Sequence, residues 1–242
     1  MSSTTDHFFE VKEQQRRDWI CTQLEDYDAD EDTPGWDDFA QDWQHMQDFR
    51  SEQEQELGWY ELHSYSDIHQ NFNHEIQNLK DLLEAPISAH HEETFYKMIY
   101  AHAVTLMESF LSDSVRSLIL SDERYFVNAI KKVDDLKNCK FSITEIAQKS
   151  DGAKGFAVTE LAKVMFHNIP KVKRILQLIL NKKVLVDISE VTEITSFRHD
   201  IVHRDGKSIE GDILRVDKDV AMDAIAKIGV FVTSIAEVIH SN

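Results

Sequence analysis

The chain has 242 residues, 42% of them hydrophobic, and a formal net charge of −18 at pH 7. Only 7 glycines and 3 prolines are present, which leaves little material for a β-sandwich with many tight turns and favours helices. No stretch approaches the roughly 18 apolar residues of a membrane span, and the N-terminal residues show no signal-peptide pattern. Cys21 and Cys139 match neither a disulfide framework nor a CxxC metal-binding pair. We therefore expect a cytoplasmic protein with reduced thiols.

The first 66 residues form a strongly acidic segment. They contain 18 acidic and 4 basic residues, together with 11 of the 23 aromatic residues and all four tryptophans. Trp36, Phe39, Trp43 and Met46 recur at the spacing of one helix face. A disordered acidic tail is poor in aromatic residues, so we predict a folded acidic helical module over residues 1–66. Its partner is either the rest of the chain or another protein.

The remaining residues read as helices joined by short connections. A connecting helix is predicted over residues 67–88, and it ends near Pro86 because proline cannot continue a helix. A long central helix is predicted at 92–120, and its middle is apolar on nearly all sides. Further helices are expected at 122–136, on both sides of Pro170, at 189–204 and at 217–240. The fold predicted for residues 89–242 is an all-α antiparallel helical bundle.

The stretch SFRHDIVHRDGK, residues 196–207, contains a cluster of basic and ionisable residues at the end of a predicted helix, although the chain as a whole is acidic. Arg198 projects from the apolar side of the predicted helix, and a guanidinium stays charged when buried, so it needs an acidic partner. Glu108 is the best candidate, because it is the only formally charged residue between Met98 and Ser112 on the central helix. The basic or ionisable residues of the stretch are Arg198, His199, His203, Arg204 and Lys207.

His203 lies in the last turn of the same predicted helix. The negative end of the helix dipole favours imidazolium there, which suits an acid–base catalyst near neutral pH. His203 is five residues after Arg198 and therefore about 140° further around the helix axis. The two side chains can meet only if the helix ends between them, or if a second copy supplies one of them across a two-fold axis. Gly206 is expected to take a left-handed conformation just after this helix end.

These residues carry a family resemblance. Arg198 and His203, which bracket four residues, resemble the R-x4-6-H motif of the HEPN superfamily. The stretch AHAVTLMESFLSDSV, residues 101–115, is similar to the first long helix of that family, which carries an acidic residue, here Glu108. The order of elements from about residue 90 onward most resembles the RiboL-PSP branch. The resemblance does not extend to the acidic module.

The resemblance implies a helical homodimer that brings two such motifs into one cleft. Many members of the superfamily are metal-independent endoribonucleases of toxin–antitoxin or phage-defence systems, so the implied partners are an RNA substrate and an antitoxin or defence-partner protein, with no cofactor. His203 would transfer protons during attack by the ribose 2′-hydroxyl, Arg198 would stabilise charge on the phosphate, and Glu108 would orient the arginine. His199, Arg204 and Lys207 would contact the flanking RNA.

Other interpretations stay open at this point. The stretch can be a charged helix end that only stabilises its own dipole. His199 and His203 have the i, i+4 spacing of a zinc-binding pair, although the HExxH motif needs glutamate where this chain has Asp200. The superfamily also includes non-catalytic modules that bind a partner protein or a nucleotide. The acidic module could mimic RNA over the cleft, or it could serve as a docking or dimerisation surface.

Overall fold

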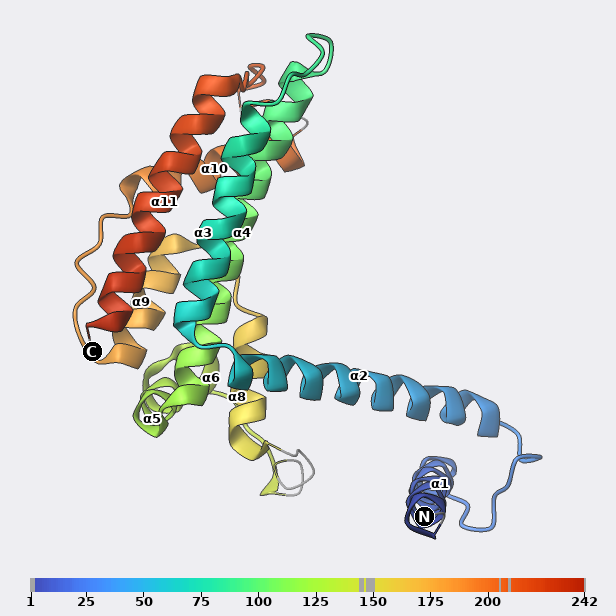
Figure 1. Ribbon diagram of the computed structural model, residues 1–242. Coiled ribbons are helices and arrows are strands. Elements are labelled where there is room, and N and C mark those ends of the chain that lie inside the picture. Colours follow the sequence, from blue (N-terminus) through green and yellow to red (C-terminus); the bar gives the residue numbers. More distant parts are fainter. Residues whose placement is uncertain (1–2, 144–145, 147–150, 205, 209, 242) are drawn as a thin grey trace. The chain divides into compact units, whose positions relative to one another are not determined.

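The computed structural model describes residues 3–143, 146, 151–204, 206–208 and 210–241 (Figure 1). Helices make up the regular structure of these residues, apart from one isolated antiparallel bridge between Lys207 and Ile213. The prediction of an all-α helical bundle is therefore confirmed. Among the described helices, none combines the length and the apolar composition that crossing a bilayer requires. Residue contacts divide the chain into two units, Met1–Glu56 and Leu57–Asn242.

The first unit consists of α1 (Ser3–Leu24) and most of α2 (Trp36–Leu62). The Trp19 ring of α1 lies 5.5 Å from the Trp43 ring and 6.3 Å from the Phe39 ring, so the aromatic face predicted for residues 36–46 packs against α1. Among the side chains of this unit that the structure describes, the buried core contains Ile20, Cys21, Ala29 and Trp36.

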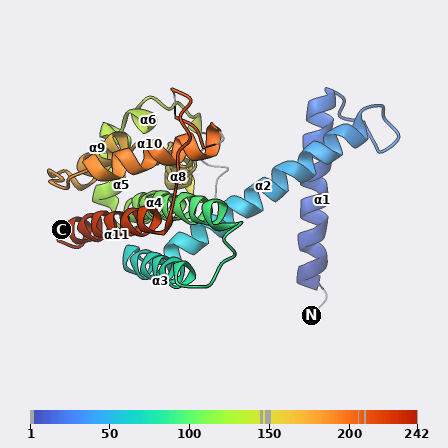
Figure 2. The same cartoon turned by 90° about the horizontal axis from the view of Figure 1, so that it is seen from above.

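Three long helices run side by side in the second unit (Figures 1 and 2). They are α3 (Tyr65–Leu83), α4 (Glu92–Ser121) and α11 (Lys218–His240). Ser64 begins α3 with a capping box, and the Asp217 side chain caps α11 by accepting from the Val220 N–H at 2.9 Å. The central position predicted for the helix at 92–120 is confirmed, because α4 packs against α3, α5, α8, α10 and α11.

The boundary between the units differs from the one expected from the sequence. The sequence placed it after residue 66 and treated residues 67–88 as a connecting helix, whereas contacts assign the chain from Leu57 onward to the bundle. Leu57 and Tyr60 are buried in the bundle core, and the Tyr60 hydroxyl donates a hydrogen bond to Asp113 Oδ1 at 2.8 Å. Because α3 packs against both α4 and α11, it is a core element of the bundle and does more than connect two domains.

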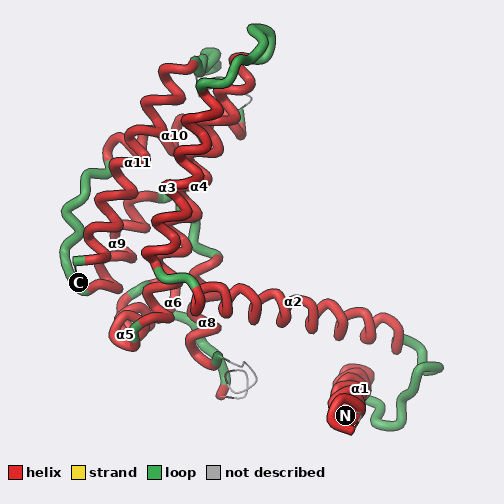
Figure 3. Tube along the Cα trace, in the orientation of Figure 1, coloured by secondary structure: helices red, strands yellow, loops and turns green. Residues whose placement is uncertain are grey.

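Shorter helices complete the bundle (Figure 3). The helix predicted at 122–136 is interrupted, because the backbone at Val133 turns to an extended conformation with φ −78° and ψ 121°. Pro170 lies in the first turn of its helix, where a missing N–H is tolerated, and the Asn168 side chain caps that helix. Those that the structure describes are α5 (Glu123–Lys132), α6 (Asp134–Lys137), α8 (Gly152–Ala162), α9 (Ile169–Leu180) and α10 (Ser189–His203).

Contacts with α4 fix the orientation of α10 about its own axis. The Tyr100 hydroxyl of α4 donates a hydrogen bond to the Ile194 carbonyl oxygen at 3.3 Å. The Tyr100 ring also lies 5.3 Å from the Phe197 ring, in an edge-on arrangement. Because the apolar side of α10 is held against α4 in this way, these contacts decide which residues of the 196–207 stretch face the bundle and which face solvent.

Candidate functional site

The basic stretch lies where α10 ends and the chain turns back toward α11. α10 ends at His203, and the left-handed conformation predicted for Gly206 is confirmed, because its φ is +71°. A Cβ atom at this position would lie 2.8 Å from Lys97 Nζ, so the turn packs closely on α4. The Leu214 N–H donates to the Gly206 carbonyl oxygen at 2.8 Å, which closes the turn before α11 begins.

Arg198 and Glu108 share one neighbourhood between α10 and α4 without forming a direct pair. Arg198 Nε and Glu108 Oε1 are both buried, and neither has a hydrogen-bond partner in the described part of the chain. Burial raises the pKa of the Glu108 carboxyl, and the positive charge of Arg198 offsets only part of that rise. The acid and the arginine that the sequence suggested as mates therefore act on each other electrostatically. Two buried polar atoms are left open to a ligand or to water.

His167 is a third ionisable side chain that acts on Glu108. It lies in the turn between α8 and α9, and after Arg198 it contributes a smaller lowering of the pKa of the Glu108 carboxyl. Its side chain is exposed. The role of His167 could not be predicted from the sequence, because an isolated histidine in a turn carries neither a periodic nor a motif signal.

The two histidines of the stretch lie together on the solvent side of the last turn. The ring centroids of His199 and His203 are 4.6 Å apart, with 40° between the ring planes, and both side chains are exposed. No hydrogen bond joins Arg198 to His203 in the described structure, which agrees with their angular separation on one helix. Within one chain, the fold turns Arg198 toward Glu108 and leaves His203 exposed at the helix end.

Among the described residues, the histidine pair has no further ligands of the kind that a zinc site needs. Zinc sites use three or four protein ligands, and within the described residues no group of three or more His, Cys, Asp or Glu side chains could hold a metal ion. Asp200, at the position where HExxH has glutamate, is ion-paired with Arg204 one turn later. This pair also neutralises part of the charge that Arg204 was expected to offer to RNA.

Two further basic residues, Lys97 and Arg215, lie at the same end of the bundle. Lys97 lies beside the turn at Gly206 and pairs with Glu93 at 2.7 Å. The pKa of the Glu93 carboxyl is lowered chiefly by Lys97 and also by the charge of Arg215. Lys207, expected to contact RNA, is exposed and has no ion pair among the described residues. Lys97 and Arg215 were missed because they belong to other elements of the chain.

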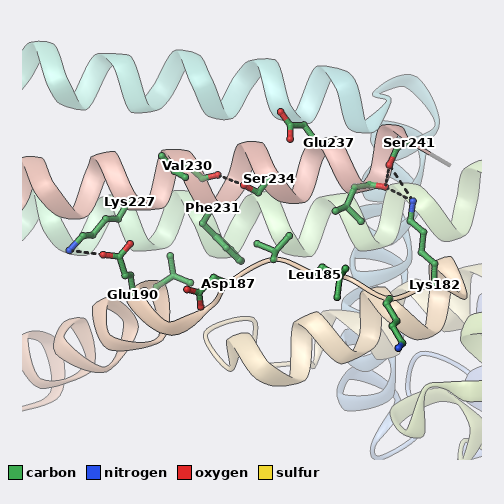
Figure 4. Close-up of a pocket in the computed structure, with 14 residues that line it drawn as sticks. Lys182, Leu185, Asp187, Glu190, Lys227, Val230, Phe231, Ser234, Glu237 and Ser241 are labelled. Carbon is green, nitrogen blue, oxygen red and sulfur yellow. Dashed lines mark hydrogen bonds and ion pairs between the residues drawn. The ribbon is translucent and has the colours of Figure 1, made fainter.

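A cavity of about 700 Å³ lies in a different part of the bundle (Figure 4). It is bounded by α11, by the segment after α9 and by the start of α10, and neither Arg198 nor His203 lines it. Glu190 in its lining lies about 20 Å from His203 along α10. Volume alone would favour this cavity as a ligand site, but Glu190 pairs with Lys227 at 3.1 Å. We place the candidate chemistry at the motif, because unpartnered buried polar atoms lie there.

The candidate site thus consists of the half-buried Arg198 and Glu108, on whose carboxylate His167 also acts, and of the exposed His199 and His203 at the end of α10. No protein-family model, no curated protein and no solved structure matches this chain.

Proposed function

We propose that the protein is a metal-independent endoribonuclease of the HEPN type, with Arg198 and His203 as its catalytic residues. The observation that carries the proposal is the state of Arg198, whose Nε is buried without a hydrogen-bond partner among the described residues. A half-buried arginine whose Nε is shielded from solvent and has no partner favours an anionic ligand, because a phosphate oxygen would satisfy that donor. His203 supplies an exposed imidazole at the end of the same helix.

The reaction would proceed through the RNA's own 2′-hydroxyl. Its oxygen forms a bond to the adjacent phosphorus and loses its proton, while the bond from phosphorus to the 5′-oxygen breaks and that oxygen gains a proton. His203 would carry out proton transfer, and Arg198 would stabilise the negative charge that builds on the phosphate oxygens. Glu108 would hold the guanidinium in place through its charge, and His199, Arg204 and Lys207 would contact the neighbouring RNA.

A second copy of the chain is part of the proposal, because Arg198 and His203 do not meet within one chain. Exposed apolar side chains on the elements around the motif support such an association. Met98 on α4 is 66% exposed, Val202 on α10 is 48% exposed and Ile213 in the following turn is 69% exposed. A two-fold related copy would bury apolar surface of this kind and would bring two motifs together.

The proposal is tested with purified protein and total RNA in the presence of EDTA. Cleavage should survive chelation, and Arg198→Ala and His203→Ala should each lower the cleavage rate by about 100-fold or more. His74→Ala and Arg124→Ala are matched controls, because both side chains are exposed and lie on other helices. Melting temperatures of all four variants show whether a loss of activity reflects a loss of fold.

The alternative is a non-catalytic HEPN-type module that binds a partner protein, such as an antitoxin or a defence protein, or a nucleotide. The position of the cavity of about 700 Å³ away from the motif favours this alternative, as does the pairing of Arg204 with Asp200. RNA that stays intact with and without divalent ions would support it. Cleavage that EDTA abolishes would contradict both candidates and would require a metal-dependent site.

A further inference from the structure

The segment between α9 and α10 has the side-chain pattern of a β-strand. Residues 183–188 are not helical, and they run as an extended connection along the outside of the bundle (Figures 1 and 3). Burial alternates from residue to residue, which is the period of a strand with one covered face. The inward side chains are Val184, Val186 and Ile188, and the outward ones are Lys183, Leu185 and Asp187.

One backbone edge of this segment is satisfied by α9. The Val184 N–H donates to Gln177 Oε1 at 3.3 Å, and the Val186 carbonyl oxygen accepts from Lys173 Nζ at 2.7 Å. In an extended chain the N–H and C=O groups of alternate residues point to the same edge. The backbone groups of Leu185 therefore point to the opposite edge, and no described residue bonds to them.

Exposed apolar side chains lie at the open edge, between the two charged ones. The Leu185 side chain is 88% exposed, and Val230 of α11, which lines the same cavity, is 69% exposed. Figure 4 shows the segment running between α9 and α11 with the side chains that line the cavity around it. An exposed strand edge with apolar side chains is a template for pairing with another chain.

From this edge we infer that two copies of the protein associate by antiparallel pairing of residues 183–187, with Leu185 of each copy opposite Leu185 of the other. In this register Lys183 of each copy lies opposite Asp187 of the other, so one two-fold axis forms two ion pairs and one apolar contact. The charges of these residues fit this register. Lys183 is exposed and has no ion pair among the described residues, and the hydrogen bond from the Ser189 hydroxyl holds the pKa of the Asp187 carboxyl below its ordinary range.

A second copy fits this edge better than an unrelated peptide does. The outward sequence Lys183, Leu185, Asp187 is complementary to itself when reversed, which is what a two-fold contact between identical segments requires. Five paired residues bury less area than a stable dimer needs, so the contact is weak and reversible when it acts alone. It lies at the opposite end of α10 from His203 and does not depend on the proposed ribonuclease activity.

Disulfide trapping tests the pairing and its register in the full chain, with Cys21 and Cys139 first replaced by alanine. Leu185→Cys should cross-link to itself under mild oxidation, because directly opposed Cα atoms lie about 5.5 Å apart, within disulfide range. Met165→Cys is the control for random collision, because Met165 is 62% exposed on another turn. We expect Leu185→Cys to cross-link about tenfold faster than this control.

The register makes a second, sharper prediction. A mixture of Lys183→Cys and Asp187→Cys chains should cross-link, whereas Lys183→Cys alone should not, because its two copies would be separated by four residues, roughly 14 Å. In the Leu185→Cys background, Lys183→Glu and Asp187→Lys should each slow cross-linking, and the two changes together should restore it. Cross-linking of Leu185→Cys at the rate of the Met165→Cys control would overturn the inference, whether or not the protein cleaves RNA.

Discussion

Glu108 Oε1 and Arg198 Nε are buried in one neighbourhood of the bundle, yet neither accepts or donates a hydrogen bond to any described residue. Buried ions are normally paired, because an unpaired one keeps the desolvation penalty without a compensating contact. The net effect on Glu108 is a raised pKa, so burial outweighs the attraction of Arg198 and His167. The ionised form of Glu108 is therefore disfavoured in the folded protein, and this effect on stability can be measured.

Glu108→Gln should raise the melting temperature near pH 7. The folded protein holds the Glu108 proton more tightly than the unfolded chain does, so ionising this carboxyl lowers stability as pH rises above its ordinary value of 4.5. Removing the ionisable group removes that loss, and the advantage of the variant should vanish below about pH 4, where Glu108 is protonated in both states. Thermal unfolding of both proteins from pH 4 to pH 8 checks this.

Glu93→Gln is the matched control for this experiment. Glu93 lies on the same helix, but the hydrogen bond from Lys97 lowers the pKa of its carboxyl, so its ionised form favours the folded state and is lost as pH falls. Glu93→Gln should leave stability unchanged or slightly reduced at pH 7. Equal destabilisation by both substitutions at neutral pH would show that Glu108 is not held in an unfavourable environment.

A chain of residues 57–242 should keep the stability of the bundle, and a chain of residues 67–242 should lose it. Leu57 and Tyr60 are each only 6% exposed in the bundle core, and removing a buried side chain of this size costs about 2–5 kcal/mol. Urea unfolding of the two truncated chains, followed by circular dichroism, measures the difference. Full-length Leu57→Ala should show part of the same loss. Equal stability of the two truncated chains would contradict the assignment of residues 57–66 to the bundle.

The same truncation addresses the role of the acidic unit. If the acidic residues restrain an RNA-binding cleft by mimicking RNA, the chain of residues 57–242 should cleave RNA faster than the full-length protein. If they form a docking or dimerisation surface instead, the cleavage rate should not change. The comparison is made at two salt concentrations, because electrostatic restraint weakens as salt is added.

The helices of the bundle could be predicted because their signals are local. Asp217 at the start of α11 and the apolar pattern of residues 92–120 depend only on neighbouring residues, and both elements lie within a residue or two of the prediction. The packing of Tyr60 against Asp113 could not be predicted, because it joins positions far apart in the sequence. The same holds for His167, which acts on Glu108 only through the arrangement of three helices and a turn. The sequence therefore suggests Glu108 and Arg198 as partners, but it does not reveal that no hydrogen bond joins them.

Gly206→Ala should destabilise the protein by about 1–2 kcal/mol. The φ of Gly206 is +71°, a conformation that costs an L-residue about this much, and the new Cβ would lie 2.8 Å from Lys97 Nζ and displace it. Gly229→Ala is the opposite case, because Gly229 lies within α11 and its Cβ would meet no atom within 4 Å. That substitution should stabilise by about 0.5–1 kcal/mol. Urea unfolding of both variants gives the signs, and a neutral Gly206→Ala would contradict the strained turn.

Mixing two inactive variants should restore part of the ribonuclease activity, if the catalytic site is shared between copies. When Arg198→Ala and His203→Ala chains exchange freely, about half of the dimers contain one chain of each kind. A site that takes its arginine from one copy and its histidine from the other is intact once in each mixed dimer, so the mixture should recover about a quarter of the wild-type rate. The rate is measured on RNA in EDTA after the two proteins are incubated together, and each variant alone provides the baseline. Light scattering on tagged chains verifies that the subunits exchange. If they exchange and no activity returns, each site draws Arg198 and His203 from a single chain. The angular separation of these residues on α10 would then argue against joint catalysis.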